Sequence, residues 1–152
     1  MNIVKHSKKS SLRSSRKKLF SIQSKQHISA YISTALFASW IGTYLDLYFV
    51  GKQWYIFLIR PYPDIFNINI MFTLIILPIL TTLFLYFMEK MQTWKKGVFI
   101  VTASLVMALG ENLAEAIGWF THSDQWEHIY SFFGYLLFMI IVWNFYRWMS
   151  SI

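Results

Sequence analysis

Four apolar segments follow one another from residue 28 almost to the C-terminus, separated only by short polar breaks. Each holds roughly 20 residues, and about 20 residues of α-helix match the roughly 30 Å hydrocarbon core of a bilayer. The composition agrees, since 56% of the residues are hydrophobic and 14% are charged, against about 25% charged residues in soluble domains. The sequence therefore predicts an all-α integral membrane bundle of four transmembrane helices, at residues 28–50, 67–88, 97–120 and 129–148.

The first 26 residues differ in composition from the rest of the chain, because they hold eight of the 14 basic residues and no acid. Such a sequence buries too little apolar surface to fold alone. We therefore expect residues 1–26 to be a disordered basic tail and residues 27–152 to be the transmembrane domain. Clustered Lys and Arg beside a helix are attracted to anionic lipid headgroups, which we expect as partners of the tail.

Two alternatives for the tail are a nucleic-acid arm and a cleavable signal peptide. No base-reading motif accompanies the basic residues, so we expect no nucleic-acid partner. The apolar segment that follows the tail is longer than the 7 to 15 residues or so that are typical of a signal peptide.

Lysine and arginine are distributed unevenly between the two ends of the predicted helices. With a cytoplasmic N-terminus, 12 of them lie on the cytoplasmic side, and Lys52 and Arg60 lie outside. Because positively charged flanks stay in the cytoplasm during insertion, this bias predicts a multi-pass protein whose N and C termini are both cytoplasmic.

Three carboxylates, those of Asp46, Glu111 and Glu115, fall inside the predicted helices. A charge in hydrocarbon costs a few kcal/mol or more, so these side chains must face protein or water. Glu111 and Glu115 are four residues apart and share one helix face. Counting along the helices places Asp46 and Glu115 at the same depth, near the outer ends.

Small residues at four-residue spacing border both sets of acids, and such stripes favour close helix packing. They are Thr34, Ala38 and Gly42 on the first helix and Gly110, Ala114 and Gly118 on the third. We therefore expect the first and third helices to flank one outward-facing acidic pocket.

The breaks on the outer side supply further candidates for this pocket. Arg60 and His122 join the three carboxylates as the main candidates, because the arginine fork suits a carboxylate such as Asp46 or Glu115. The secondary candidates are Lys52, Asn112, Asp124 and His128. Two interpretations stay open: the acids are neutralised and hold the bundle together, or they line a path for an ion, a proton or a substrate.

A metal site is a further alternative, because Glu115, His122, Asp124 and His128 carry ligand atoms that suit zinc, iron or manganese. The sequence Glu-x-x-x-Glu, however, lacks the Glu-x-x-His pattern of di-iron bundles. We therefore expect neither a metal nor another cofactor.

No catalytic motif stands out in the sequence, which contains no Walker loop, dinucleotide fingerprint or Gly-x-Ser-x-Gly elbow. Ser123 lies between His122 and Asp124, but residues do not form a catalytic triad merely by being adjacent. We assign no catalytic residue and expect a non-enzymatic protein. The alternative is a membrane-embedded enzyme that acts on lipid or on an outer-face substrate.

Several short runs carry a resemblance to a known family. They are Gly42-Thr43-Tyr44-Leu45-Asp46, Val50-Gly51-Lys52, Tyr55, Arg60-Pro61-Tyr62-Pro63, Ile65-Phe66-Asn67-Ile68-Asn69 and Leu77-Pro78. With a looser likeness from Glu111 to Tyr146, the chain resembles an uncharacterised family of small multi-spanning membrane proteins of endospore-forming bacteria. The resemblance implies a location in the bacterial inner membrane and no catalytic residue, and the basic tail departs from the family pattern.

Together these patterns favour a small membrane subunit or a solute- or ion-handling module. The lipid bilayer is one expected partner. Another membrane protein or a second copy of the chain is the other, because the small residues between positions 110 and 118 suit packing within one chain or between chains.

Overall fold

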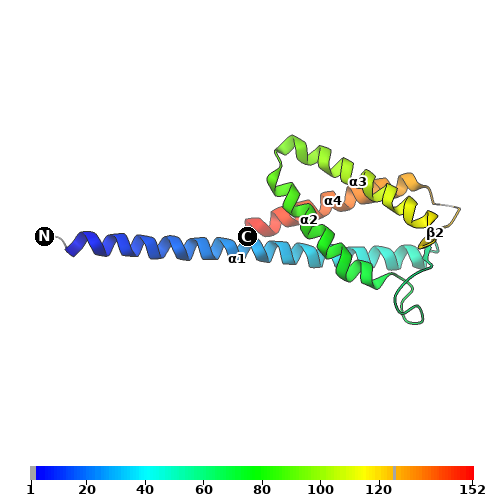
Figure 1. Ribbon diagram of the computed structural model, residues 1–152, viewed down its shortest axis with the longest axis horizontal. Helices are drawn as coiled ribbons and strands as arrows, with labels where there is room; N and C mark the ends of the chain where they lie inside the picture. The colour runs from blue at the N-terminus through cyan, green and yellow to red at the C-terminus, as the bar shows by residue number, and fades with distance from the viewer. Residues whose placement is uncertain (1–2, 125) are drawn as a thin grey trace.

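The structure is a computed structural model that describes the backbone of residues 3–124 and 126–152, and side chains from Lys25 onward. Helices dominate it, with two very short strands near one end (Figure 1). In chain order the elements are α1 (Ile3–Gly51), β1 (Tyr55–Phe57), the π-helix η1 (Phe72–Ile76), α2 (Leu77–Lys90), α3 (Thr93–Ala116), β2 (Phe120–His122) and α4 (His128–Ser151).

Four helical segments are long and apolar enough to cross a bilayer, as the sequence predicted. They are Lys25–Gly51, Phe72–Lys90, Thr93–Ala116 and His128–Ser151. Only 17% to 22% of the most apolar stretch of each is buried inside the protein. Most of the apolar surface of these helices therefore faces outward.

The sequence predicts a disordered tail through residue 26, and α1 begins within this segment, at Ile3. No glycine or proline occurs before Gly42, and Lys, Arg and Gln are good helix formers. A helix that has already formed can extend into such a sequence without a new nucleation step. As a result, α1 projects beyond the other helices, and the C-terminus lies beside its middle (Figure 1).

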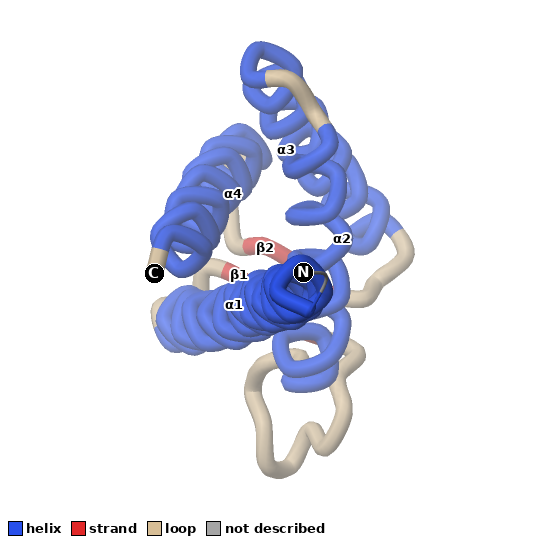
Figure 2. The backbone as a smooth tube through the Cα atoms, turned by 90° about the vertical axis from the view of Figure 1, so that its left-hand side faces the viewer, coloured by secondary structure: helices blue, strands red, loops and turns tan. Residues whose placement is uncertain are grey.

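The helices pair differently from the expectation. α3 packs against α4, and α1 packs against α2 and α4, so that α4 lies between α3 and α1 in the end-on view (Figure 2). α1 and α3, which the sequence predicts to flank one acidic pocket, are not among the closely packed pairs.

The small residues of α1 explain this arrangement. Thr34 and Ala38 are fully buried, and a side chain at Gly42 would overlap Leu77 at the start of α2. The stripe therefore packs against α2. Gly110 on α3 is exposed, and a Cβ added there would meet no described atom from outside its own stretch of helix within 4 Å.

The π-helix η1 ends at Ile76, two residues before Pro78. Proline cannot donate a backbone hydrogen bond, and a π-turn changes the pairing of the carbonyls before it. α1 satisfies one of these carbonyls, since the hydroxyl of Ser39 donates to the carbonyl oxygen of Thr73 at 2.7 Å.

α3 ends at Ala116, four residues before the predicted end at residue 120. Gly118 adopts φ +77°, the left-handed conformation that terminates many helices. Its N–H donates to the carbonyl of Glu115 at 2.9 Å, and the N–H of Trp119 donates to that of Ala114 at 2.9 Å, which is the Schellman pattern. The chain then turns into β2, which pairs antiparallel with β1 so that His122 lies opposite Tyr55.

Replacing Gly118 by alanine tests the turn that positions β2. Because an L-residue in the left-handed region costs about 1–2 kcal/mol, Gly118→Ala is expected to lower the thermal unfolding midpoint of the detergent-purified protein. The matched control is Gly97→Ala inside α3, where an added Cβ meets nothing within 4 Å and the midpoint should stay equal or rise. Equal midpoints for both variants would contradict the role of the turn.

Candidate functional site

Polar side chains from four elements meet at the end of the bundle that carries β1 and β2. Glu111 and Glu115 come from the last turns of α3, His122 from β2, and His128 is the first residue of α4. We call these four residues the Glu–His cluster. Tyr55 on β1 lies beside it, with its ring centroid 5.9 Å from that of His122.

His122 is the centre of the cluster. Its Nδ1 lies 2.8 Å from Oε2 of Glu115, and its Nε2 lies 3.2 Å from Oε1 of Glu111. The backbone N–H of His122 also donates to Oε1 of Glu115 at 2.8 Å. The indole of Trp126 stacks on the imidazole at an interplanar angle of 1°, so the ring is held by both its edge and its face.

The surroundings of His122 act on its pKa in opposite directions. Burial favours the neutral imidazole and lowers the pKa, but the hydrogen bonds and charges of Glu111 and Glu115 outweigh burial, so the pKa is raised above its usual value. The imidazole side chain is only 6% exposed. The raised pKa favours the protonated imidazole, which can donate to both carboxylates.

Glu111 is oriented by α4. The hydroxyl of Ser131 donates to Oε1 of Glu111, and the phenol of Tyr135 donates to its Oε2. Trp126 in turn donates from Nε1 to the Ser131 hydroxyl at 3.0 Å. These bonds fix the carboxylate in the position where it meets His122.

Asp46 lies next to the cluster without joining its ion pairs. Its Oδ1 accepts a hydrogen bond of 2.6 Å from the Tyr55 phenol, while its Oδ2 is buried and has no hydrogen-bond partner among the described residues. Burial and then the charge of Asp46 raise the pKa of Tyr55 well above its usual value, so the phenol keeps its proton. A buried carboxylate oxygen without a partner is costly and is suited to accept a proton or a cation.

Arg60 does not pair with Asp46 or Glu115, and that expectation is wrong. Its Nε donates to the carbonyl of Phe66 at 2.7 Å, and its terminal nitrogens donate to those of Phe57 and, at 3.4 Å, Pro63. The chain between β1 and η1 contains carbonyls that no regular element satisfies, and the five donors of an arginine suit them. Arg60 thus organises this loop.

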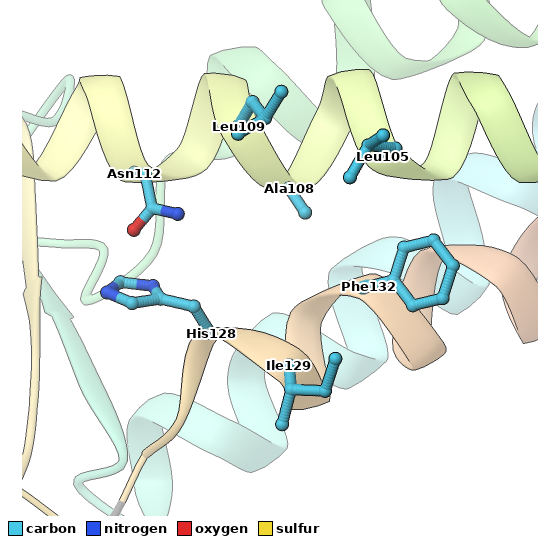
Figure 3. Close-up of a pocket in the computed structure, with 7 residues that line it drawn as sticks. All are labelled: Leu105, Ala108, Leu109, Asn112, His128, Ile129 and Phe132. Carbon is cyan, nitrogen blue, oxygen red and sulfur yellow. The ribbon is translucent and has the colours of Figure 1, made fainter.

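The secondary candidates divide into two groups. Lys52 is exposed, with its Nζ 5.9 Å from the ring centroid of Tyr48, and Asp124 is exposed at the surface. Asn112 and His128, in contrast, lie at one end of an apolar groove between α3 and α4 and point toward each other (Figure 3). The groove has a volume of about 330 Å³.

Two other predicted arrangements can be compared with the structure. The Ser123 hydroxyl is buried and bonds to none of the described residues, so no base activates it as a nucleophile. Of the four possible metal ligands, His122 and His128 form a candidate ligand group with Glu111 and not with Glu115 and Asp124, and one ligand atom of each member lies within 4.8 Å of the others.

A second polar cluster lies at the opposite end of the bundle and was missed in the sequence. Glu89 at the end of α2 accepts hydrogen bonds from Tyr31 at 2.6 Å and from Tyr146, and its Oε1 lies 2.8 Å from Nε2 of His27. Its partners are 57 or more residues away in the chain. The only indication in the sequence was that His27, Tyr31 and Tyr146 lie near the same predicted membrane surface as Glu89.

Comparisons with protein-family models, curated proteins and solved structures find no match to this chain. Its function must therefore be inferred from the geometry of its own residues.

The charge state of His122 predicts how stability depends on pH in metal-free buffer. The stabilisation from a raised pKa is fully present below the unfolded value of about 6.5 and is lost as the pH rises through the folded value. Two charge-assisted hydrogen bonds, to Glu111 and Glu115, weaken when His122 loses its proton, so we expect a loss of about 2 kcal/mol. His128 and Tyr55 also lie against the ring, and neither carries a carboxylate.

The measurement is the unfolding midpoint of the detergent-purified protein, with EDTA present, as the pH is raised from below about 6.5 through the raised pKa of folded His122. His122→Gln should have a lower midpoint at neutral pH and should lack the fall that the unaltered protein shows at higher pH. An identical pH profile for both proteins would exclude the protonated bridge.

Proposed function

We propose that this chain is a multi-pass integral membrane protein of the bacterial inner membrane, with cytoplasmic N and C termini, and that it handles cations through the Glu–His cluster. Four helices of spanning length support the membrane assignment. Large apolar side chains on their outer faces support it as well, with Leu36 65% and Trp40 67% exposed. Surfaces of this kind require an apolar solvent or a partner.

The positions of the chain ends are compatible with the proposed orientation. Tyr146 near the C-terminus contacts His27 at the start of the first apolar segment. Both termini therefore leave the bundle at the same end, and the Glu–His cluster lies at the other. With the basic residues on the cytoplasmic side, as the charge bias favours, the cluster faces outward.

The composition of the cluster carries the proposal for its role. Within the described part of the chain, the ion-pair partners of Glu111 and Glu115 are histidines. A lysine or arginine would neutralise these carboxylates permanently and cannot coordinate a cation, whereas an imidazole nitrogen is itself a ligand. The cluster therefore offers oxygen and nitrogen ligands, and the buried oxygen of Asp46 adds one more acceptor beside it.

Access to the cluster is also suited to a small solute. Glu115 is 25% exposed and His128 is 50% exposed, while Glu111 and His122 behind them are 13% and 6% exposed. Exposure thus decreases from the surface inward. A cation that enters beside His128 meets progressively more buried ligands.

Reporter fusions test the membrane orientation. Alkaline phosphatase, which is active only outside the cytoplasm, should be inactive when it is fused after Ile152 and active when it is fused after Asp64. Green fluorescent protein, which folds in the cytoplasm, should give the reverse pattern at the same positions. Active phosphatase after Ile152 would exclude cytoplasmic termini.

Ligand-induced stabilisation tests the cation-handling role. The unfolding midpoint of the detergent-purified protein is measured with monovalent, alkaline-earth, transition-metal and organic cations. Binding at 100 times the dissociation constant stabilises by about 2.7 kcal/mol, so at least one class should raise the midpoint by several degrees. The double variant Glu111→Gln, Glu115→Gln should lose this response, and the exposed loop variant Asp64→Asn should keep it. A protein that responds to no cation has no such role.

A further inference from the structure

Three side chains of the Glu–His cluster are arranged as metal ligands. Glu111 from α3, His122 from β2 and His128 from α4 each place one ligand atom within 4.8 Å of the other two. In a tetrahedral site with metal–ligand bonds of about 2.0–2.1 Å, neighbouring ligand atoms are about 3.3 Å apart. The distance between Nε2 of His122 and Oε1 of Glu111 is already 3.2 Å.

The third ligand, His128, is the most exposed of the three. The side chain of His128 is 50% exposed and stands at the end of the groove between α3 and α4 (Figure 3). It is therefore free of the packing that fixes the other two ligands. Closure of His128 onto a bound ion would bring its ring nitrogen from the edge of the site into coordination range.

The hydrogen bonds behind the ligands match those of metal sites. A metal-bound histidine usually donates its other ring N–H to a carboxylate, which fixes the ring and the tautomer. Glu115 holds Nδ1 of His122 at 2.8 Å, so that Nε2 points at Glu111 and at the position of the ion. Ser131 and Tyr135 hold Glu111 from the far side and leave lone pairs of its carboxylate available.

The charge of the site fits a divalent ion. Glu111 and Glu115 carry two negative charges, and a divalent cation balances both when the histidines coordinate as neutral imidazoles. Two histidines and one carboxylate are the ligands of catalytic zinc sites and of non-haem iron sites. Magnesium and calcium, in contrast, prefer oxygen ligands only.

We propose that Glu111, His122 and His128 bind one divalent transition-metal ion of the zinc, iron or manganese class, with Glu115 as the residue that positions His122. This inference deepens the proposed cation-handling function and rests on it. Three protein ligands leave a coordination position open on the side of the groove, where water or a small solute can bind. This proposal replaces the expectation of no metal, and its ligand set differs from the alternative set, which contained Glu115 and Asp124.

The test uses the full chain, purified in detergent, stripped with EDTA and dialysed. Zn²⁺ is titrated by calorimetry, and its content is measured by mass spectrometry after desalting. We expect one Zn²⁺ per chain. Co²⁺ should give the visible absorption of a coordinated ion, and excess Zn²⁺ should remove it.

The variants separate ligands from neighbours. Because the side chain of His128 is half-exposed, the variant His128→Gln should fold normally. Its affinity for Zn²⁺ should be reduced at least about tenfold. Glu111→Gln and His122→Gln should abolish stoichiometric binding, and Glu115→Gln should weaken it by about 10- to 100-fold while keeping one ion per chain. The matched control is His27→Gln, in the cluster at the other end of the bundle, which should bind like the unaltered protein.

The possible outcomes distinguish this inference from the broader function. Less than one Zn²⁺ per chain in the unaltered protein, or unchanged affinity in His128→Gln, overturns the metal site. If Ca²⁺, Mg²⁺ or a monovalent cation binds in a way that depends on Glu111 and Glu115 but not on the histidines, the metal site fails and the cation-handling role stands. If no cation binds, both fail.

Discussion

The cost of a carboxylate in an apolar environment governs how this bundle is assembled. Each acid on the long helices is held by donors whose bodies are themselves apolar, most often tyrosine phenols. The pairs are Tyr55 with Asp46, Tyr135 with Glu111, and Tyr31 and Tyr146 with Glu89. A phenol buries its ring like a core residue and still presents one hydrogen-bond donor. The helices can therefore meet at their two ends around polar groups, although the apolar core between these ends is thin.

The two polar ends of the bundle differ in a way that bears on function. The Glu89 cluster joins α1, α2 and α4 and contains one carboxylate with three donors around it. The Glu–His cluster contains two carboxylates around one buried imidazole, and its residues come from the end of α3, the strand β2 and the start of α4. Buried, hydrogen-bonded ligand side chains together with a more exposed histidine suit the binding and release of a cation. A purely structural contact would not need this gradient of exposure.

The sequence predicted the helices well and their pairing poorly. Hydropathy locates four apolar helices because it depends only on residue type and length, and the i, i+4 spacing correctly placed Glu111 and Glu115 on one face. The end of α3 was predicted four residues too late, because the apolar residues continue to position 120 whereas the left-handed turn at Gly118 ends the helix. The strands have only three residues each, too few for an alternating pattern to be detected. The pairing of α1 with α2 depends on the close contact of Gly42 with Leu77, and no pattern in the sequence shows which residues on different helices will meet. Arg60 was misjudged because the loop carbonyls that it binds are visible only once the loop is folded.

The energetics of buried ion pairs argue against a purely structural cluster. Replacing a buried ion pair by apolar residues of similar volume is often neutral or stabilising, so stability alone does not require two glutamates around His122. The arrangement also uses more hydrogen bonds than charge neutralisation needs, since Ser131, Tyr135 and the backbone of His122 orient the carboxylates as well. Such orientation has little value for a charge that only needs a counter-charge, but it is necessary when ligand atoms must converge on one point. Cation binding therefore gives a physical reason for the convergence of Glu111, His122 and His128.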